Sequence, residues 1–180
     1  MKKIILTFGS MAGIVCIALF YAKMPIDGQF DFEDMSQVYG YISMAIALSS
    51  IFFATKQYRD KYNDGVISFG KAFLIGIGIT IVAAIFYVVA WEIYFSKFGE
   101  GFVDGYVAFM TEQLVESGLS IDEAKEKIAP EASMMESYKN NTLMRMGFTT
   151  LEIFPIGLLI SLLSALVFGV IMKRKAATLI

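Results

Sequence analysis

The stretch that decides the fold covers residues 69–94 and reads FGKAFLIGIGITIVAAIFYVVAWEIY. Its two charged side chains, Lys71 and Glu92, lie near its ends, and the residues between them are apolar, aromatic or small. The hydrocarbon core of a bilayer is about 30 Å thick, and roughly 20 helical residues cross it. The stretch therefore predicts a transmembrane helix with one charged residue at each membrane surface.

Three further apolar runs of similar length cover residues 4–21, 38–54 and 148–172. The chain as a whole is 57% hydrophobic and only 18% charged, whereas soluble domains are nearer half apolar and a quarter charged. The apolar residues are gathered in blocks, which is typical of membrane spans. We therefore expect an all-α fold: a single membrane domain over residues 1–180, built as an integral bundle of four transmembrane helices.

Charged residues near the span ends predict which loops face the cytoplasm. Acidic residues dominate the first connection, 22–37, and the third, 95–147, whereas cations gather before the first span, between the second and third spans, and after the fourth. These cations are Lys2, Lys3, Lys56, Arg59, Lys61, Lys71, Lys173, Arg174 and Lys175. The pattern predicts that both termini are cytoplasmic and that the long loop 95–147 is outside.

The first span has an alternative interpretation, because a basic start followed by an apolar run is also typical of a signal peptide. The run is about 18 residues long, which exceeds a usual signal-peptide core. Cleavage after Ala22 would also put Phe20 where a small side chain is expected. The sequence therefore favours a retained helix.

The long outer loop is expected to contain short amphipathic helices. Val103, Val107, Met110 and Leu114 are spaced three and four apart, as on one helix face. Gly118 suits a helix C-cap, and Ser120 with Glu123 has the form of a capping box for a second helix. That helix is expected to run to Pro130, which either ends it or starts a new turn. Asn140 and Asn141 are expected to form the hinge into the last span.

The outer loop allows two interpretations. The sequence favours helices that lie on the outer membrane surface or cover the bundle. The alternative is a cap that binds a ligand or a partner.

Small residues recur along the spans at the four-residue interval that lets helix backbones approach closely in lipid. They predict that the third and fourth spans pack on facing grooves. The residues concerned are Gly9 and Gly13 in the first span, Ala72, Gly76, Thr80 and Ala84 in the third, and Gly157, Ser161, Ala165 and Gly169 in the fourth.

Two acids, Glu92 and Glu152, stand at the outer ends of the third and fourth spans and are expected at similar depth. Pro155 lacks an amide donor, so the carbonyl of Leu151 loses its usual helical partner beside Glu152. These groups form a candidate polar site.

This pair of acids has three interpretations. The first is that both carboxylates simply reach interfacial water within an aromatic belt. The second is an outward-open pocket of Glu92, Glu152 and the Leu151 carbonyl that holds a cation, a proton or a ligand amine. The third is a structural ion pair in which Arg145 or Lys97 neutralises one of the acids.

The composition argues against several classes of function. Without histidine, imidazole-based catalysis and imidazole metal or haem ligation are excluded, and the one cysteine, Cys16, cannot form an internal disulfide. No cofactor and no metal site is expected. The basic clusters are short and close to the membrane, so they give no sign of nucleic-acid binding. Catalysis is the least favoured class, because no activated nucleophile accompanies the two acids.

Three blocks of the sequence carry a resemblance to a known family. They are YGYISMAIALSSIFFATKQYRDKYNDGVISFGKAF at 39–73, YVVAWEIYF at 87–95 and MGFTTLEIFPIGLLISLLSAL at 146–166. The chain resembles bacterial membrane proteins catalogued as domain of unknown function 4199. The resemblance implies a small four-span protein of the bacterial inner membrane, and it transfers no catalytic residue.

For function, the sequence favours a non-catalytic accessory or interaction module whose contacts are the lipid bilayer and a membrane-protein partner or a second copy of the chain. The alternative is a protein that binds or transports a small molecule or cation, with an outward-facing site at Glu92 and Glu152.

Overall fold

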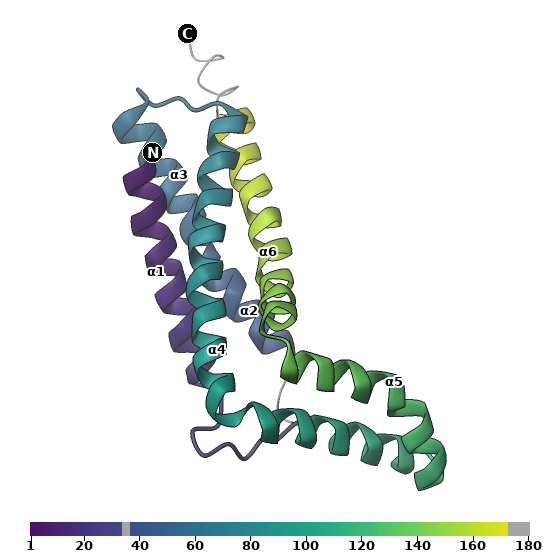
Figure 1. Ribbon diagram of the computed structural model, residues 1–180. Helices are drawn as coiled ribbons and strands as arrows, with labels where there is room; N and C mark the ends of the chain where they lie inside the picture. Colours follow the sequence, from purple (N-terminus) through teal and green to yellow (C-terminus); the bar gives the residue numbers. More distant parts are fainter. Residues whose placement is uncertain (34–36, 173–180) are drawn as a thin grey trace.

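The computed structural model describes residues 1–33 and 37–172, and all regular secondary structure within them is helical (Figure 1). In chain order the elements are α1 (Lys2–Tyr21), α2 (Gln37–Leu48), α3 (Ser50–Tyr62), α4 (Phe69–Glu116), α5 (Ile121–Asn140), α6 (Thr142–Leu166) and the π-helical turn η1 (Val167–Ile171). The predicted all-α class is confirmed for these residues.

Four helical segments are long and apolar enough to cross a membrane, and they correspond to the four predicted spans. They are Lys2–Tyr21, Val38–Tyr62, Phe69–Glu116 and Thr142–Ile171. The start of α1 and the end of η1 lie at the same end of the bundle, here called the termini end (Figure 1). The opposite end is called the arm end. The tail Lys173–Arg174–Lys175, which contributes to the topology prediction, lies outside the described residues.

The helices extend further than the predicted boundaries. The second segment continues to Tyr62 and is interrupted once, at Ser49. There the Ser49 hydroxyl donates to the carbonyl of Ile46 at 2.6 Å, an example of a side chain competing with helical backbone bonding. The fourth segment begins at Thr142 rather than at residue 148, because Asn141 caps it by accepting from the amide of Met144 at 3.1 Å.

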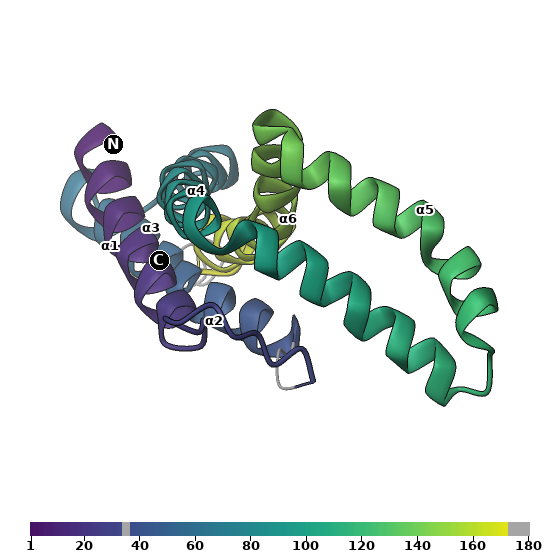
Figure 2. The same ribbon diagram turned by 60° about the horizontal axis from the view of Figure 1, so that its bottom comes forward.

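The third segment differs most from the prediction, because α4 runs to Glu116 instead of ending at residue 94. Its C-terminal part turns away from the bundle and pairs with α5 (Figures 1 and 2). These two pieces, residues 97–140, are called the arm. Gly118, with φ +104°, ends α4, and Ser120 and Glu123 form the reciprocal capping box that starts α5.

Pro130 does not end the second arm helix, contrary to the expectation, because α5 continues through it to Asn140. A proline deprives the carbonyl four residues earlier, here that of Glu126, of its amide donor. Both Pro130 and Glu126 are exposed, so water can bond that carbonyl. The helix therefore tolerates the proline at this surface position.

The small-residue grooves of α4 and α6 face each other. A Cβ atom added to Gly76 would lie 2.5 Å from the Ser161 hydroxyl oxygen, and one added to Gly157 would collide with the side chain of Thr80. Gly169 approaches the backbone of Phe69 in the same way, and Ala72, Ala84 and Ala165 are buried. The close approach of the two backbones fixes how α6 lies on α4.

A second close approach joins α1 to α4. A Cβ atom added to Gly9 would lie 2.6 Å from Cβ of Val82, and one added to Gly13 would lie 2.5 Å from Cβ of Phe86. The central helix α4 is therefore held between α1 and α6 by glycine contacts on two sides.

Aromatic side chains hold the arm against the arm end of the bundle. Phe20 of α1 packs edge-on to Trp91 and Tyr94 of α4, with ring centroids 5.6 and 5.7 Å apart. Further along α4, the ring of Phe102 packs edge-on to that of Trp91 at 5.4 Å. The membrane-length part of α4 and its arm part thus share one aromatic cluster.

Candidate functional site

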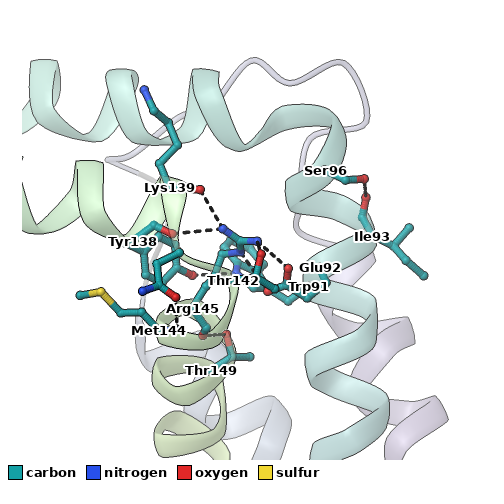
Figure 3. Close-up of polar contacts among 11 residues, drawn as sticks. Trp91, Glu92, Ile93, Ser96, Tyr138, Lys139, Thr142, Met144, Arg145 and Thr149 are labelled. Carbon is teal, nitrogen blue, oxygen red and sulfur yellow. Dashed lines mark hydrogen bonds and ion pairs between the residues drawn. The ribbon is translucent and has the colours of Figure 1, made fainter.

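The arm end contains a buried polar cluster centred on Arg145, in the first turns of α6 (Figure 3). Its guanidinium forms a two-pronged ion pair with Glu92 of α4, with Nε–Oε1 at 2.9 Å and Nη2–Oε2 at 2.6 Å. The Arg145 side chain is 8% exposed and that of Glu92 is 17% exposed. Such paired hydrogen bonds between fixed planar groups are strong and directional.

The remaining three N–H groups of Arg145 also have partners. Nη1 donates to the carbonyls of Tyr138 and Lys139, at 3.1 and 3.0 Å, and Nη2 donates to the hydroxyl of Thr142 at 3.2 Å. The two carbonyls belong to the last turn of α5, where carbonyls lack helical donors. Arg145 therefore caps α5 and links it to α4.

Two aromatic rings complete the surroundings of Arg145. Its guanidinium lies 4.2 Å from the ring centroid of Phe95 and 6.0 Å from that of Tyr138. The hydroxyl of Tyr138 in turn accepts from the indole N–H of Trp91 at 2.6 Å. Burial raises the pKa of the Tyr138 hydroxyl to about 12, so this group stays neutral under physiological conditions. Two polar contacts, from Arg145 and from Trp91, thus attach the end of α5 to the bundle.

The structure gives the two acids of the candidate polar site different partners. Glu92 is paired with Arg145, which corresponds to the third of the interpretations of the sequence. Glu152 accepts a hydrogen bond from the hydroxyl of Tyr87 at 3.4 Å. The Leu151 side chain is 67% exposed. Within the described part of the chain the two carboxylates share no hydrogen-bond or ion-pair partner, so Glu92 lies in an ion pair and Glu152 lies apart from it.

Beside the Arg145 cluster lies a cavity of about 480 Å³, enclosed by α1, the connection after it, α2, α4, α5 and α6. Glu152 lines it, and Glu92 and Arg145 do not. Most of its wall is aromatic or apolar, and the other charged residues in the described part of the lining are Lys23 and Asp31. Its aromatic lining residues are Phe20, Tyr39, Tyr87, Trp91, Phe102, Tyr106, Tyr138 and Phe148. The cavity thus combines a concave, mostly apolar surface with the exposed carboxylate of Glu152.

The residues that the structure describes offer no group of three or more acidic or cysteine side chains that could hold a metal ion. Cys16 lines the cavity as a buried thiol in α1. The arrangement suits the binding of an organic molecule by aromatic rings and by the carboxylates of the lining.

Comparison with known families gives a match over residues 7–169, to the family described as "Protein of unknown function (DUF4199)". The chain belongs to the DUF4199 family. No curated protein and no solved structure matches it. The matched region contains α2 to α6 entirely and most of α1, so the Arg145 cluster and the cavity both lie within the DUF4199 region.

The aromatic wall of this DUF4199 cavity was not predicted, although the sequence contains a signal for it. Along α4 an aromatic side chain occurs at positions 87, 91, 95, 98, 102 and 106, every three or four residues, so one helix face is aromatic from the span into the arm. Prediction of a span boundary at residue 94 divides this stripe in two. The cavity also needs Phe148 and Glu152 of α6, whose proximity is visible only in the folded chain.

Proposed function

We propose that this protein is a non-catalytic membrane protein that binds a small, largely apolar organic molecule in the cavity at the arm end. The observation that carries the proposal is the cavity of about 480 Å³, with its aromatic and thioether wall. Binding sites for small molecules are typically concave and mostly apolar, with a few placed polar groups. A binding role also agrees with a sequence that has no histidine and one buried cysteine.

In this proposal the four helical segments cross the inner membrane of a bacterium, with both termini in the cytoplasm and the arm outside. The distribution of cations supports this orientation, because Lys2, Lys3, Lys61 and Lys71 belong to the helix ends and the turn at the termini end. The arm then lies along the outer membrane surface, which places the cavity at the depth of the outer leaflet.

The orientation predicts which single cysteines an impermeant maleimide labels. In a Cys16→Ser background, Ser133→Cys on the exposed face of the arm is expected to react on intact spheroplasts. The matched control, Lys61→Cys at the exposed end of α3, is expected to react only after lysis. Labelling of the control but not of the arm on intact spheroplasts would contradict the orientation.

The binding function can be tested with Trp91, the chain's one tryptophan, because it lines the cavity. We expect 1-bromo-4-tert-butylbenzene, whose bromine quenches indole fluorescence on contact, to quench Trp91 saturably in lipid nanodiscs. Gly40→Leu is expected to weaken this quenching at least tenfold. Gly40 lines the cavity, and no atom lies within 4 Å of an added Cβ, so a leucine side chain can start into the cavity without a clash at its first carbon.

The matched control is Gly147→Leu in α6, where an added Cβ also meets nothing within 4 Å and which does not line the cavity. In this control the probe is expected to quench Trp91 as strongly as it does in the unmodified protein. Equal quenching of Gly40→Leu and Gly147→Leu would show that the probe reaches Trp91 from the bilayer and not through the cavity, and the proposed function would be wrong.

The second candidate is the accessory or interaction module, and the arm is the feature that favours it. The arm projects sideways from the bundle, and the exposed residues of α5 include Asp122, Lys125, Glu126 and Lys127. A membrane-protein partner or a second copy of the chain could contact this charged face. This candidate predicts a protein that co-purifies with the chain, and it predicts that Glu152→Gln and Gly40→Leu leave that association unchanged.

A further inference from the structure

We infer that the ligand of the arm-end cavity carries an ammonium group, held by the Glu152 carboxylate and by the faces of the surrounding aromatic rings. The inference rests on the proposed function and specifies the chemical class of its ligand: an organic cation with an apolar body. Three features of the cavity support it, namely an unneutralised carboxylate, a wall of ring faces, and an ammonium of the chain itself against that wall.

The carboxylate of Glu152 is open to the cavity and its charge is not balanced by an ion pair. It accepts a hydrogen bond from the neutral hydroxyl of Tyr87, at 3.4 Å, and no lysine or arginine of the described ranges 1–33 and 37–172 pairs with it. Arg145, seven residues earlier on the same helix, uses all five N–H groups elsewhere. A cationic ligand would give Glu152 the counter-ion that Glu92 already has.

The net charge of the cavity wall also favours a cation. Among the described residues the charged lining side chains are Lys23, Asp31 and Glu152, one cation and two anions, so this part of the wall carries a net charge of −1. An anionic ligand would meet this negative charge inside a mostly apolar enclosure.

Aromatic rings supply the second element of ammonium recognition. The faces of aromatic rings attract cations within about 6 Å of the ring centroid, most strongly for tryptophan and when water is excluded. Phe20, Tyr87 and Trp91 all line the cavity, and Phe20 lies edge-on to the other two, with centroids 6.0 and 5.6 Å apart. Rings set at right angles to one another present aromatic surface in more than one direction, unlike a flat stack.

The chain itself already places an ammonium against this wall. Nζ of Lys23 lies 5.8 Å from the ring centroid of Tyr39, and both residues line the cavity. Lys23 belongs to the connection after α1, and Tyr39 belongs to α2. It shows that the wall accommodates an alkylammonium next to an aromatic face.

The apolar body of the ligand would meet flexible side chains. Met24, Met44, Met134 and Met135 line the cavity together with Leu19. Methionine side chains are unbranched and polarisable, so they adapt to ligands of different shape. The cavity therefore selects for charge at the Glu152 end and tolerates variation in the remainder of the molecule.

The test compares two probes of the same shape, one charged and one neutral. They are 4-bromophenyltrimethylammonium and 1-bromo-4-tert-butylbenzene. The three methyl groups are carried by a positively charged nitrogen in the first and by a neutral carbon in the second. Binding of each probe is measured by quenching of Trp91 fluorescence in nanodiscs. We expect Glu152→Gln to weaken binding of the cation by about tenfold, the factor that corresponds to one desolvated cation–ring or ion contact. Binding of the neutral probe is expected to change less than about twofold in the same variant.

Binding of the neutral probe reports whether the variant protein is folded with its cavity open. For each probe, the affinity of the variant is divided by that of the unmodified protein, which removes differences in how the probes partition into lipid. Glu112→Gln, an exposed acid of the arm outside the cavity, is the matched control and is expected to leave both affinities unchanged. If Glu152→Gln weakens the binding of both probes equally, or the binding of neither, the ammonium assignment is wrong while the proposed binding function stands. If neither probe quenches the unmodified protein, the proposed function itself is wrong.

Discussion

Replacing Arg145 by methionine is expected to lower the free energy of unfolding by about 3–5 kcal/mol, the usual consequence of removing one partner of a buried ion pair. The Glu92 carboxylate, 17% exposed, would lose its counter-ion, and the carbonyls of Tyr138 and Lys139 would lose their donor. The measurement is the unfolding equilibrium of the purified protein in detergent, followed by the fluorescence of Trp91.

A double-mutant cycle separates the ion pair from other effects of the substitution. In Glu92→Met/Arg145→Met neither charge is left unpaired, so the double variant is expected to lose less stability than Arg145→Met alone. Arg145→Lys is expected to be intermediate, because an ammonium keeps the charge but cannot reproduce five donors in a fixed plane. If the losses in free energy of unfolding of the two single variants add up to the loss in the double variant, Arg145 and Glu92 do not form the ion pair that the structure shows.

The Arg145 variants should also change the arm more than the bundle. The guanidinium caps the last turn of α5, so its loss is expected to speed amide hydrogen exchange at the end of α5 before it affects α4. Trp91 keeps its own contact with Tyr138 and limits how far the arm can detach. Equal acceleration along α4 and α5 would argue against a local capping role.

The sequence predicts the helix-packing face well, because that face follows from local rules. Small residues at a four-residue interval leave little choice about which face of α4 meets α6, and Gly76 and Gly157 lie at that contact. The number of membrane-length helices follows equally from length and composition. These features depend on neighbours in the chain, so they can be recognised without the fold.

The candidate site is harder to predict because its groups come from distant parts of the chain. Glu92 and Arg145 are 53 residues apart, and only the path of the arm brings the start of α6 beside the middle of α4. The sequence placed Glu92 and Glu152 at similar depth, but depth alone does not determine which way a side chain faces around a helix. The partner of each acid is decided by helix rotation and by the arm.

The length of α4 exceeds the prediction because membrane length alone sets the predicted end at residue 94. A span of membrane length is complete by residue 94, yet no proline follows before Gly118, and α4 continues through Gly99, Gly101 and Gly105. Helix continuation depends on local propensity, whereas the direction of the helix depends on packing against α5 and the first connection. Length arguments therefore predict the number of membrane-length helices more reliably than they predict where each helix ends.

The second large effect is expected at the crossing of α4 and α6. We expect Gly157→Ala to lower the free energy of unfolding by about 1–3 kcal/mol, the usual cost of one extra carbon in a well-packed core. The added Cβ would collide with the fully buried side chain of Thr80. Thr80 cannot rotate away without breaking the bond from its hydroxyl to the carbonyl of Gly76, at 3.0 Å.

Gly147→Ala supplies the matched control on the same helix, because an added Cβ there meets no atom within 4 Å. Alanine favours a helix over glycine by about 0.5–1 kcal/mol, so this variant is expected to be more stable than the unmodified protein. Identical substitutions on one helix should thus have opposite signs in the same unfolding measurement. Adding Thr80→Ala to Gly157→Ala should recover part of the loss, since it removes the two side-chain atoms that collide most closely. If Gly147→Ala and Gly157→Ala change the free energy of unfolding in the same direction, the close backbone approach of α4 and α6 is absent in the folded protein.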